Sequence, residues 1–194
     1  MMFMADPSGD GRSNRERMLA GDPYIPDDPD NHRRHLNALK LTPDFINTYP
    51  HDEAAALGIL KELLGSLGTD TIVKPPLYVD YGSHLFIGNG TFVNTGLVAL
   101  DSASISIGAD CQLGPNVQLL TASHPLDPAV RREKWETCKP IRIGDNAWVG
   151  AGAIVLAGIT IGDNSVIGAG AVVTRDIPAN VLAVGNPAKV IRQI

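Results

Sequence analysis

Hydrophobic positions between Ile143 and Pro178 recur every six residues. A period of six matches neither the 3.6-residue period of an amphipathic helix nor the two-residue alternation of a half-buried strand. It is typical of a hexapeptide solenoid, in which short parallel strands stack about 4.8 Å apart. Each unit opens on a β-branched residue and has a small or branched residue at its fifth place: Ile143, Val149, Val155, Ile161, Ile167 and Val173, then Ala147, Ala153, Ile159, Ser165, Ala171 and Ile177.

Three units make a longer period of eighteen residues. The place after each opening residue reads Gly, Gly and then a larger residue, twice in succession, so we expect three strands and three corners in each coil. The signal begins near Tyr81, and eight residues instead of six separate Ala99 from Ile107. The surplus predicts a bulge at one corner. The earlier openers are Ile87, Val93, Ala99, Ile107, Leu113 and Leu119.

The first third of the chain shows helical patterns instead. Ser13 with Glu16 forms a capping box, which predicts a short helix that ends near Gly21. Asp28–Pro29 and Thr42–Pro43 predict two further helix starts.

The strongest predicted helix runs from about Asp52 to Leu64. Its apolar residues follow the i, i+3, i+4, i+7 spacing of one buried face, and we expect that face to cover an open end or flank of the solenoid. These residues are Ala56, Leu57, Leu60, Leu63, Leu64 and Leu67.

Residues 125–142 interrupt the repeat. They contain proline, charge and Trp135 where core residues should lie. We interpret them as a loop extruded after His124, and long loops in compact folds are usually functional or disordered. The predicted organisation is a disordered tail over residues 1–12, a helical segment over 13–68 and an all-β solenoid over 69–194.

Composition narrows the function classes. A length of 194 residues suits one domain, or one domain with an appendage, and 16 basic against 21 acidic residues give a net charge of −5. This balance argues against a nucleic-acid or anionic-membrane surface. Cys111 falls on a small corner position and Cys138 in the predicted loop. We interpret both as free thiols of a cytoplasmic protein.

Two polar residues break the repeat. Asn94 occupies the slot that holds glycine in other coils, and His124 closes a coil where Thr160 and Pro178 stand elsewhere. The alternative interpretation is that both are ordinary surface residues at corners. A zinc site is not expected, because the solenoid offers only His84 and His124, at distant positions, and a zinc site of this kind needs three histidines.

Several longer motifs carry a family resemblance. They are ERMLAGDPY, DYGSHLFIGNGTFVN, TASHPLDP, IGDNAWVGAGAIV, GAGAVVTRDIP and VGNPAKVIR. The chain resembles the maltose/galactoside O-acetyltransferase family, including the nodulation-type enzymes. The resemblance implies a left-handed parallel β-helix with an N-terminal helical segment. It also implies transfer of an acetyl group from acetyl-CoA to a sugar hydroxyl, with no metal.

The resemblance assigns roles to individual residues. His124 takes the position of the catalytic base, and Asn94 that of the polar group that stabilises the transition state and contacts both substrates. The remaining cofactor positions are Trp148, Gly150, Ala151 and Ala169 along the pantetheine channel and Thr174, Arg175, Lys189 and Arg192 at the adenine and phosphate end. The C-terminal basic residues could instead be merely solvated. The remaining acceptor positions are Asp80, Ser102, Glu136 and Asp27.

The positions of Asn94 and His124 predict a homotrimer. Asn94 opens the middle face of its coil and His124 ends the third face one coil later, so within one prism they point in different directions. Threefold packing would join them between subunits, with Trp135 near the loop tip reaching over the neighbour. A non-catalytic scaffold and an N-acetyltransferase acting on an amine remain as alternatives.

Overall fold

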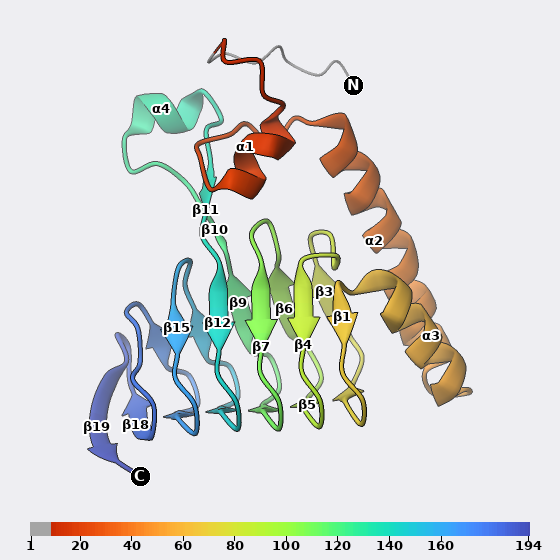
Figure 1. The fold of residues 1–194 in the computed structure, drawn as a ribbon, viewed down its shortest axis with the longest axis vertical. Coiled ribbons are helices and arrows are strands. Elements are labelled where there is room, and N and C mark those ends of the chain that lie inside the picture. The colour runs from red at the N-terminus through yellow and green to blue at the C-terminus, as the bar shows by residue number, and fades with distance from the viewer. Residues whose placement is uncertain (1–8) are drawn as a thin grey trace.

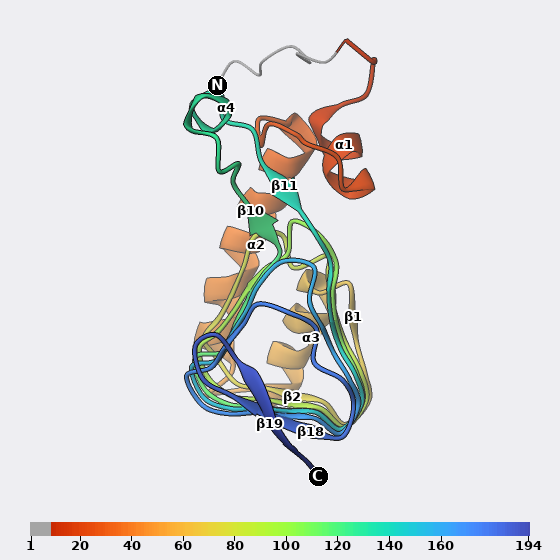
Figure 2. The same ribbon diagram turned by 90° about the vertical axis from the view of Figure 1, so that its left-hand side faces the viewer.

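A computed structural model describes residues 9–194 of the chain. Three parallel sheets form the walls of a prism, and each complete coil contributes one strand to each sheet (Figures 1 and 2). The first sheet contains β1 (Ser66–Leu67), β4 (Leu85–Ile87), β7 (Ile105–Ile107), β12 (Ile141–Ile143) and β15 (Thr160–Ile161). The second contains β2 (Ile72–Val73), β5 (Phe92–Val93), β8 (Gln112–Leu113), β13 (Trp148–Val149), β16 (Val166–Ile167) and β18 (Val181–Val184), with β19 (Lys189–Gln193) added antiparallel. The third contains β3 (Leu77–Val79), β6 (Leu97–Leu100), β9 (Gln118–Leu120), β14 (Ile154–Val155) and β17 (Val172–Val173).

The hexapeptide prediction is confirmed by the core of this parallel β-helix. The opening residues point into the prism, where Val149, Val155 and Ile161 are fully buried. Glycine follows an opener where coils approach closely. A Cβ at Gly150 would lie 2.5 Å from the backbone nitrogen of Ala169, a distance that no real Cβ contact shows.

The bulge occurs in two coils, not one. Phe86 pairs with Ser66 and with Ser106, so the first coils are twenty residues long, whereas Arg142 pairs with Thr160, eighteen residues on. The surplus lies at the corner between the third and first sheets, called here the third corner. The solenoid also begins at β1, well before the signal near Tyr81. The first coil carries Pro75 and Pro76 where the last two complete coils have Ala–Gly pairs, Ala151–Gly152 and Ala169–Gly170.

Three helices precede the solenoid: α1 (Asn14–Ala20), α2 (Pro29–Thr48) and α3 (Glu53–Leu63). The Ser13 capping box and the helix start at Asp28–Pro29 are present as predicted, and Asp52 caps α3. The predicted helix start at Thr42–Pro43 is wrong, because α2 runs on through Pro43. Burial of Leu41 and Phe45 on either side of this proline favours the continuous helix.

Helices α2 and α3 stand at the β1 end of the prism (Figure 1). Helix α2 contacts β3 and α3 contacts β1, and both strands lie at the ends of their sheets. Ala56, Leu60 and Leu63 of the predicted apolar face are buried, while Leu57 is 37% exposed. The helices therefore cover the first coil, whose strand edges would otherwise be free.

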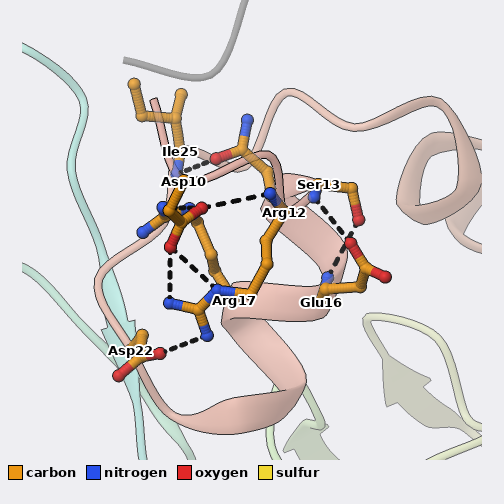
Figure 3. Close-up of polar contacts among 8 residues, drawn as sticks. Asp10, Arg12, Ser13, Glu16, Arg17, Asp22 and Ile25 are labelled. Carbon is orange, nitrogen blue, oxygen red and sulfur yellow. Dashed lines mark hydrogen bonds and ion pairs between the residues drawn. The ribbon is translucent and has the colours of Figure 1, made fainter. Parts of the chain in front are cut away.

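The last residues of the predicted tail contact α1. Residues 1–8 lie outside the described part of the chain, so the prediction of disorder is not tested there. The Asp10 carboxylate forms ion pairs with Arg17 and Arg12, and Arg12 also pairs with Asp22 beyond the helix (Figure 3). These contacts join the segment before α1 to the helix itself and to Asp22, which follows it.

The extruded loop contains regular structure. It leaves through β10 (Ala122–Ser123), forms α4 (Pro128–Arg132) at its tip and returns through β11 (Thr137–Cys138), antiparallel to β10. The predicted end at residue 142 is wrong, because β12 begins at Ile141. Cys138 lies in β11 rather than in an open loop and is 1% exposed. Trp135 is half-buried beside β11, not at the tip.

No helix among residues 9–194 is long and apolar enough to cross a membrane.

Candidate active site

His124 stands at the third corner, directly after β10. Its side chain is 61% exposed, and its Nδ1 lies 3.8 Å from Oε1 of Glu136. The imidazole opens into a pocket of about 470 Å³ between the extruded loop and the segment after α1. The lining residues are Ile25, Pro26, Asp27, His124, Arg131, Lys134 and Glu136.

Tyr24 holds Glu136 from the other side. The two residues form an antiparallel bridge: Tyr24 N–H donates to the Glu136 carbonyl (3.0 Å), and Glu136 N–H donates to the Tyr24 carbonyl (2.8 Å). The phenol hydroxyl donates to Oε2 of Glu136 at 3.1 Å. Burial and the Glu136 charge raise the pKa of Tyr24 far above its ordinary value, so the hydroxyl keeps its proton.

A second acidic group lies at the same corner, one to two coils earlier. The Ser102 hydroxyl donates to Oδ2 of Asp80 at 3.3 Å. Burial, together with the nearby Asp101 charge, raises the pKa of Asp80 to about 6. The Asp101 carboxylate is fully buried and accepts the backbone N–H groups of Asp80, Tyr81 and His84 at 3.0, 2.8 and 3.0 Å.

Asp101 therefore holds in place the extra residues at the third corner of the first coil. His84 adds to this arrangement through a 2.8 Å bond between its Nδ1 and the Asp101 carbonyl. The sequence showed the surplus but gave no signal for the buried acid that organises it. Tyr24 was likewise missed as a contact of Glu136, because the two residues lie far apart in the sequence and only the fold joins them.

Asn94 lies at another corner, between the second and third sheets, directly after β5. Its N–H donates to the Leu113 carbonyl at 3.0 Å, and its side-chain Oδ1 accepts from Thr95 N–H at 2.8 Å. The side-chain N–H₂ group is the donor that Asn94 can offer to a ligand.

The predicted cofactor residues follow Asn94 along the corner between the second and third sheets, called here the second corner. Gly150 and Ala151 come directly after β13, Ala169 comes one coil later after β16, and the Trp148 ring is exposed beside them. The four residues predicted at the phosphate end lie at the C-terminal end of the prism and are all exposed: Thr174, Arg175, Lys189 and Arg192.

One chain holds the predicted residues in two separate groups. His124, Glu136 and Asp27 line one pocket, and Asp80 meets Ser102 near it. Asn94 and the cofactor positions belong to the other corner. The view along the coils shows β10 at one apex of the prism, and the second sheet, with β2 and β18, as the opposite wall (Figure 2).

Comparisons with known proteins agree with this architecture. A family model described as "Maltose acetyltransferase hexapeptide capping motif" matches residues 17–68, and one described as "Hexapeptide repeat of succinyl-transferase" matches residues 140–175. Nodulation protein L of Rhizobium leguminosarum bv. viciae is 42% identical over 92% of this chain and 94% of its own length.

Two solved structures share the whole fold. A hexapeptide-repeat acetyltransferase from Vibrio cholerae, complexed with acetyl coenzyme A, is 36% identical with a TM-score of 0.88, over 94% of this chain and 98% of its own. A galactoside acetyltransferase in complex with coenzyme A is 35% identical with a TM-score of 0.91, over 95% and 92% of the two chains. This chain thus belongs to the maltose/galactoside O-acetyltransferase family of hexapeptide-repeat proteins.

Proposed function

We propose that the protein transfers an acetyl group from acetyl-CoA to a sugar hydroxyl, with His124 as the general base. The observation that carries the proposal is an exposed imidazole paired with Glu136 at the mouth of a pocket large enough for a sugar. A neutral imidazole can accept a proton from an alcohol that is otherwise a weak nucleophile.

The transfer needs no covalent enzyme intermediate. His124 Nε2 removes the hydroxyl proton as the sugar oxygen forms a bond to the thioester carbonyl. The carbon–sulfur bond then breaks, and the proton passes to the leaving thiolate. Cys138, the thiol near the site, is unsuited to carry the acetyl group, because burial raises its pKa to about 11.

Asn94 is proposed to stabilise the oxyanion of this step. Its Oδ1 is occupied by Thr95 N–H, which orients the amide so that Nδ2 is free to donate. Loss of one such donor costs about 3 to 4 kcal/mol of transition-state stabilisation in enzymes where it has been measured.

The second corner suits coenzyme A. A Cβ at Gly114 or at Gly150 would clash with the backbone of the next coil. The surface at the second corner is therefore formed by backbone atoms and small side chains. Arg175, Lys189 and Arg192 add positive charge at its C-terminal end, where a nucleotide phosphate would be bound. Direct transfer then takes place in a ternary complex of protein, acetyl-CoA and sugar.

The active form is proposed to be a homotrimer with sites between subunits. One chain keeps His124 and Asn94 at different corners of the prism, and a closed threefold arrangement brings one chain's third corner against its neighbour's second corner. Leu126, 96% exposed on the extruded loop, supplies an apolar contact for the neighbour.

The proposed acceptor is a small carbohydrate. Asp80, Ser102, Asp27 and Glu136 offer carboxylate and hydroxyl groups at or near the pocket, which is the chemistry that sugar hydroxyls require. Both cysteines are free and buried, and we propose the cytoplasm as the place of action.

The first test is His124→Ala, assayed with acetyl-CoA and a panel of sugars by thiol release. The expected loss of turnover is at least about a hundredfold, and an unchanged rate would remove His124 as the base. A scaffold that has lost its chemistry would not bind acetyl-CoA, whereas a ligand at a hundred times its Kd adds about 2.7 kcal/mol of stability. Product analysis for ester or amide separates O-transfer from N-transfer.

A further inference from the structure

The hydroxyl of Tyr24 is a buried polar group with a defined partner. Tyr24 is 1% exposed and packs with Met18 and Cys138 beneath the extruded loop. A buried phenol needs a hydrogen-bond partner, and the phenol has one in Oε2 of Glu136. Because its pKa is raised by burial, Tyr24 acts as a permanent donor in this bond.

Glu136 uses its two oxygens differently. Oε2 accepts from Tyr24 at 3.1 Å, and Oε1 faces Nδ1 of His124 at 3.8 Å. The backbone of Glu136 is held by two hydrogen bonds to Tyr24 as well. With one oxygen fixed by the phenol, the carboxylate plane cannot rotate freely, and the other oxygen stays directed at the imidazole.

A carboxylate facing Nδ1 selects one tautomer of a histidine. At 3.8 Å the contact is electrostatic, and the negative carboxylate favours the proton on Nδ1, which leaves the lone pair of Nε2 for the substrate hydroxyl. The His124 side chain is 61% exposed, so packing does little to hold the ring. Its orientation therefore depends on Glu136, and that of Glu136 depends on Tyr24.

We infer that Tyr24 is a positioning residue of the active site, acting on His124 through Glu136. This inference rests on the proposed role of His124 as the base. It makes the segment between α1 and α2 part of the catalytic apparatus, and not only a cover for the solenoid. Figures 1 and 2 show α1 beside β11, the strand that begins directly after Glu136.

The test is a double-mutant cycle between Tyr24→Phe and Glu136→Gln. Phenylalanine keeps the ring in its packing and removes only the hydroxyl. We expect Tyr24→Phe to lower kcat about tenfold, with the KM for the sugar within about threefold of wild type. In the Glu136→Gln background the same substitution should change kcat less than twofold, because residues that act through one another are not additive.

Tyr81→Phe is the matched control. It removes a phenol hydroxyl from the same apolar cluster, where that hydroxyl contacts the Met18 sulfur, and kcat should stay within twofold of wild type. A purely structural role of Tyr24 predicts equal losses in both Glu136 backgrounds, together with a lowered Tm.

Equal losses, or a wild-type kcat for Tyr24→Phe, would overturn the inference. His124→Ala, measured alongside, separates it from the proposed function. An inactive His124→Ala with a fully active Tyr24→Phe refutes the role of Tyr24 alone, whereas an active His124→Ala refutes both.

Discussion

Replacing Asp80 with asparagine should stabilise the protein at neutral pH and weaken its use of the sugar. The pKa of Asp80 is raised from 3.8 to about 6 in the folded state, first by burial and then by Asp101. Between these two values the folded state binds more protons than the unfolded state, so the favourable contribution of protonated Asp80 is present below pH 4. It is lost as pH rises through 6.

The magnitude follows from the shift of about two units, each corresponding to about 1.4 kcal/mol. At pH 7.5 the ionised carboxylate thus costs up to about 3 kcal/mol relative to a neutral side chain of the same shape. The Asp80→Asn protein should gain up to that amount, equivalent to about 6 to 12 °C in Tm for a chain of this size. An amide oxygen can still accept from Ser102, so the local hydrogen bond need not be lost.

Thermal melts of both proteins between pH 4 and pH 8 measure the effect. The gain in Tm should be largest above pH 7 and should vanish near pH 4, and Asp44→Asn, which removes a charge from an exposed site on α2, should show no such trend. A destabilised Asp80→Asn at pH 7.5, or a gain that does not depend on pH, would refute the argument. If Asp80 contacts the acceptor, the KM for the sugar rises in the same protein.

Two further predictions follow from the corners. His124→Ala and Asn94→Ala, each inactive alone, should regain part of the activity when they are denatured and refolded together, because some interfaces in a mixed trimer join two intact halves. An inactive mixture with proven subunit exchange would place the whole site in one chain. Gly150→Ala should lower the free energy of unfolding by roughly 1 to 3 kcal/mol, since its Cβ would lie 2.5 Å from the Ala169 nitrogen. Gly58→Ala is the control: it lies in open space on α3 and should raise the free energy of unfolding by about 0.5 to 1 kcal/mol. Equal Tm changes for the two glycine variants would contradict the close approach of the coils.

Much of the fold was predictable because equivalent positions recur in successive coils of the solenoid. Openers such as Val149 and Ile161 report the same environment in successive coils, and helix caps such as Ser13 act within four residues. The start of the solenoid and the continuity of α2 through Pro43 were not predictable in this way. Both depend on packing between the helices and the first coil, which local patterns do not contain.

The candidate site divides along the same line. His124 and Asn94 were singled out as candidates because each breaks a repeat, so the other coils act as internal references. Tyr24 and Asp101 lie outside any repeat, in the helical segment and in a surplus corner. Their partners are fixed by the fold: Tyr24 meets Glu136 across 112 residues, and the three N–H groups that Asp101 binds lie one coil earlier.

The strand after the extruded loop resumes the ladder in perfect step. β12 pairs with β7 as β7 pairs with β4, with Ile141 opposite Ile105, although an excursion with its own hairpin and helix separates them. The β10–β11 pair closes the base of this excursion, so the register of the prism does not depend on the length of the segment beyond it. The part of the loop around α4 can accordingly be lengthened or reshaped without a shift in the register of the prism, provided that Glu136 keeps its contacts with Tyr24 and His124.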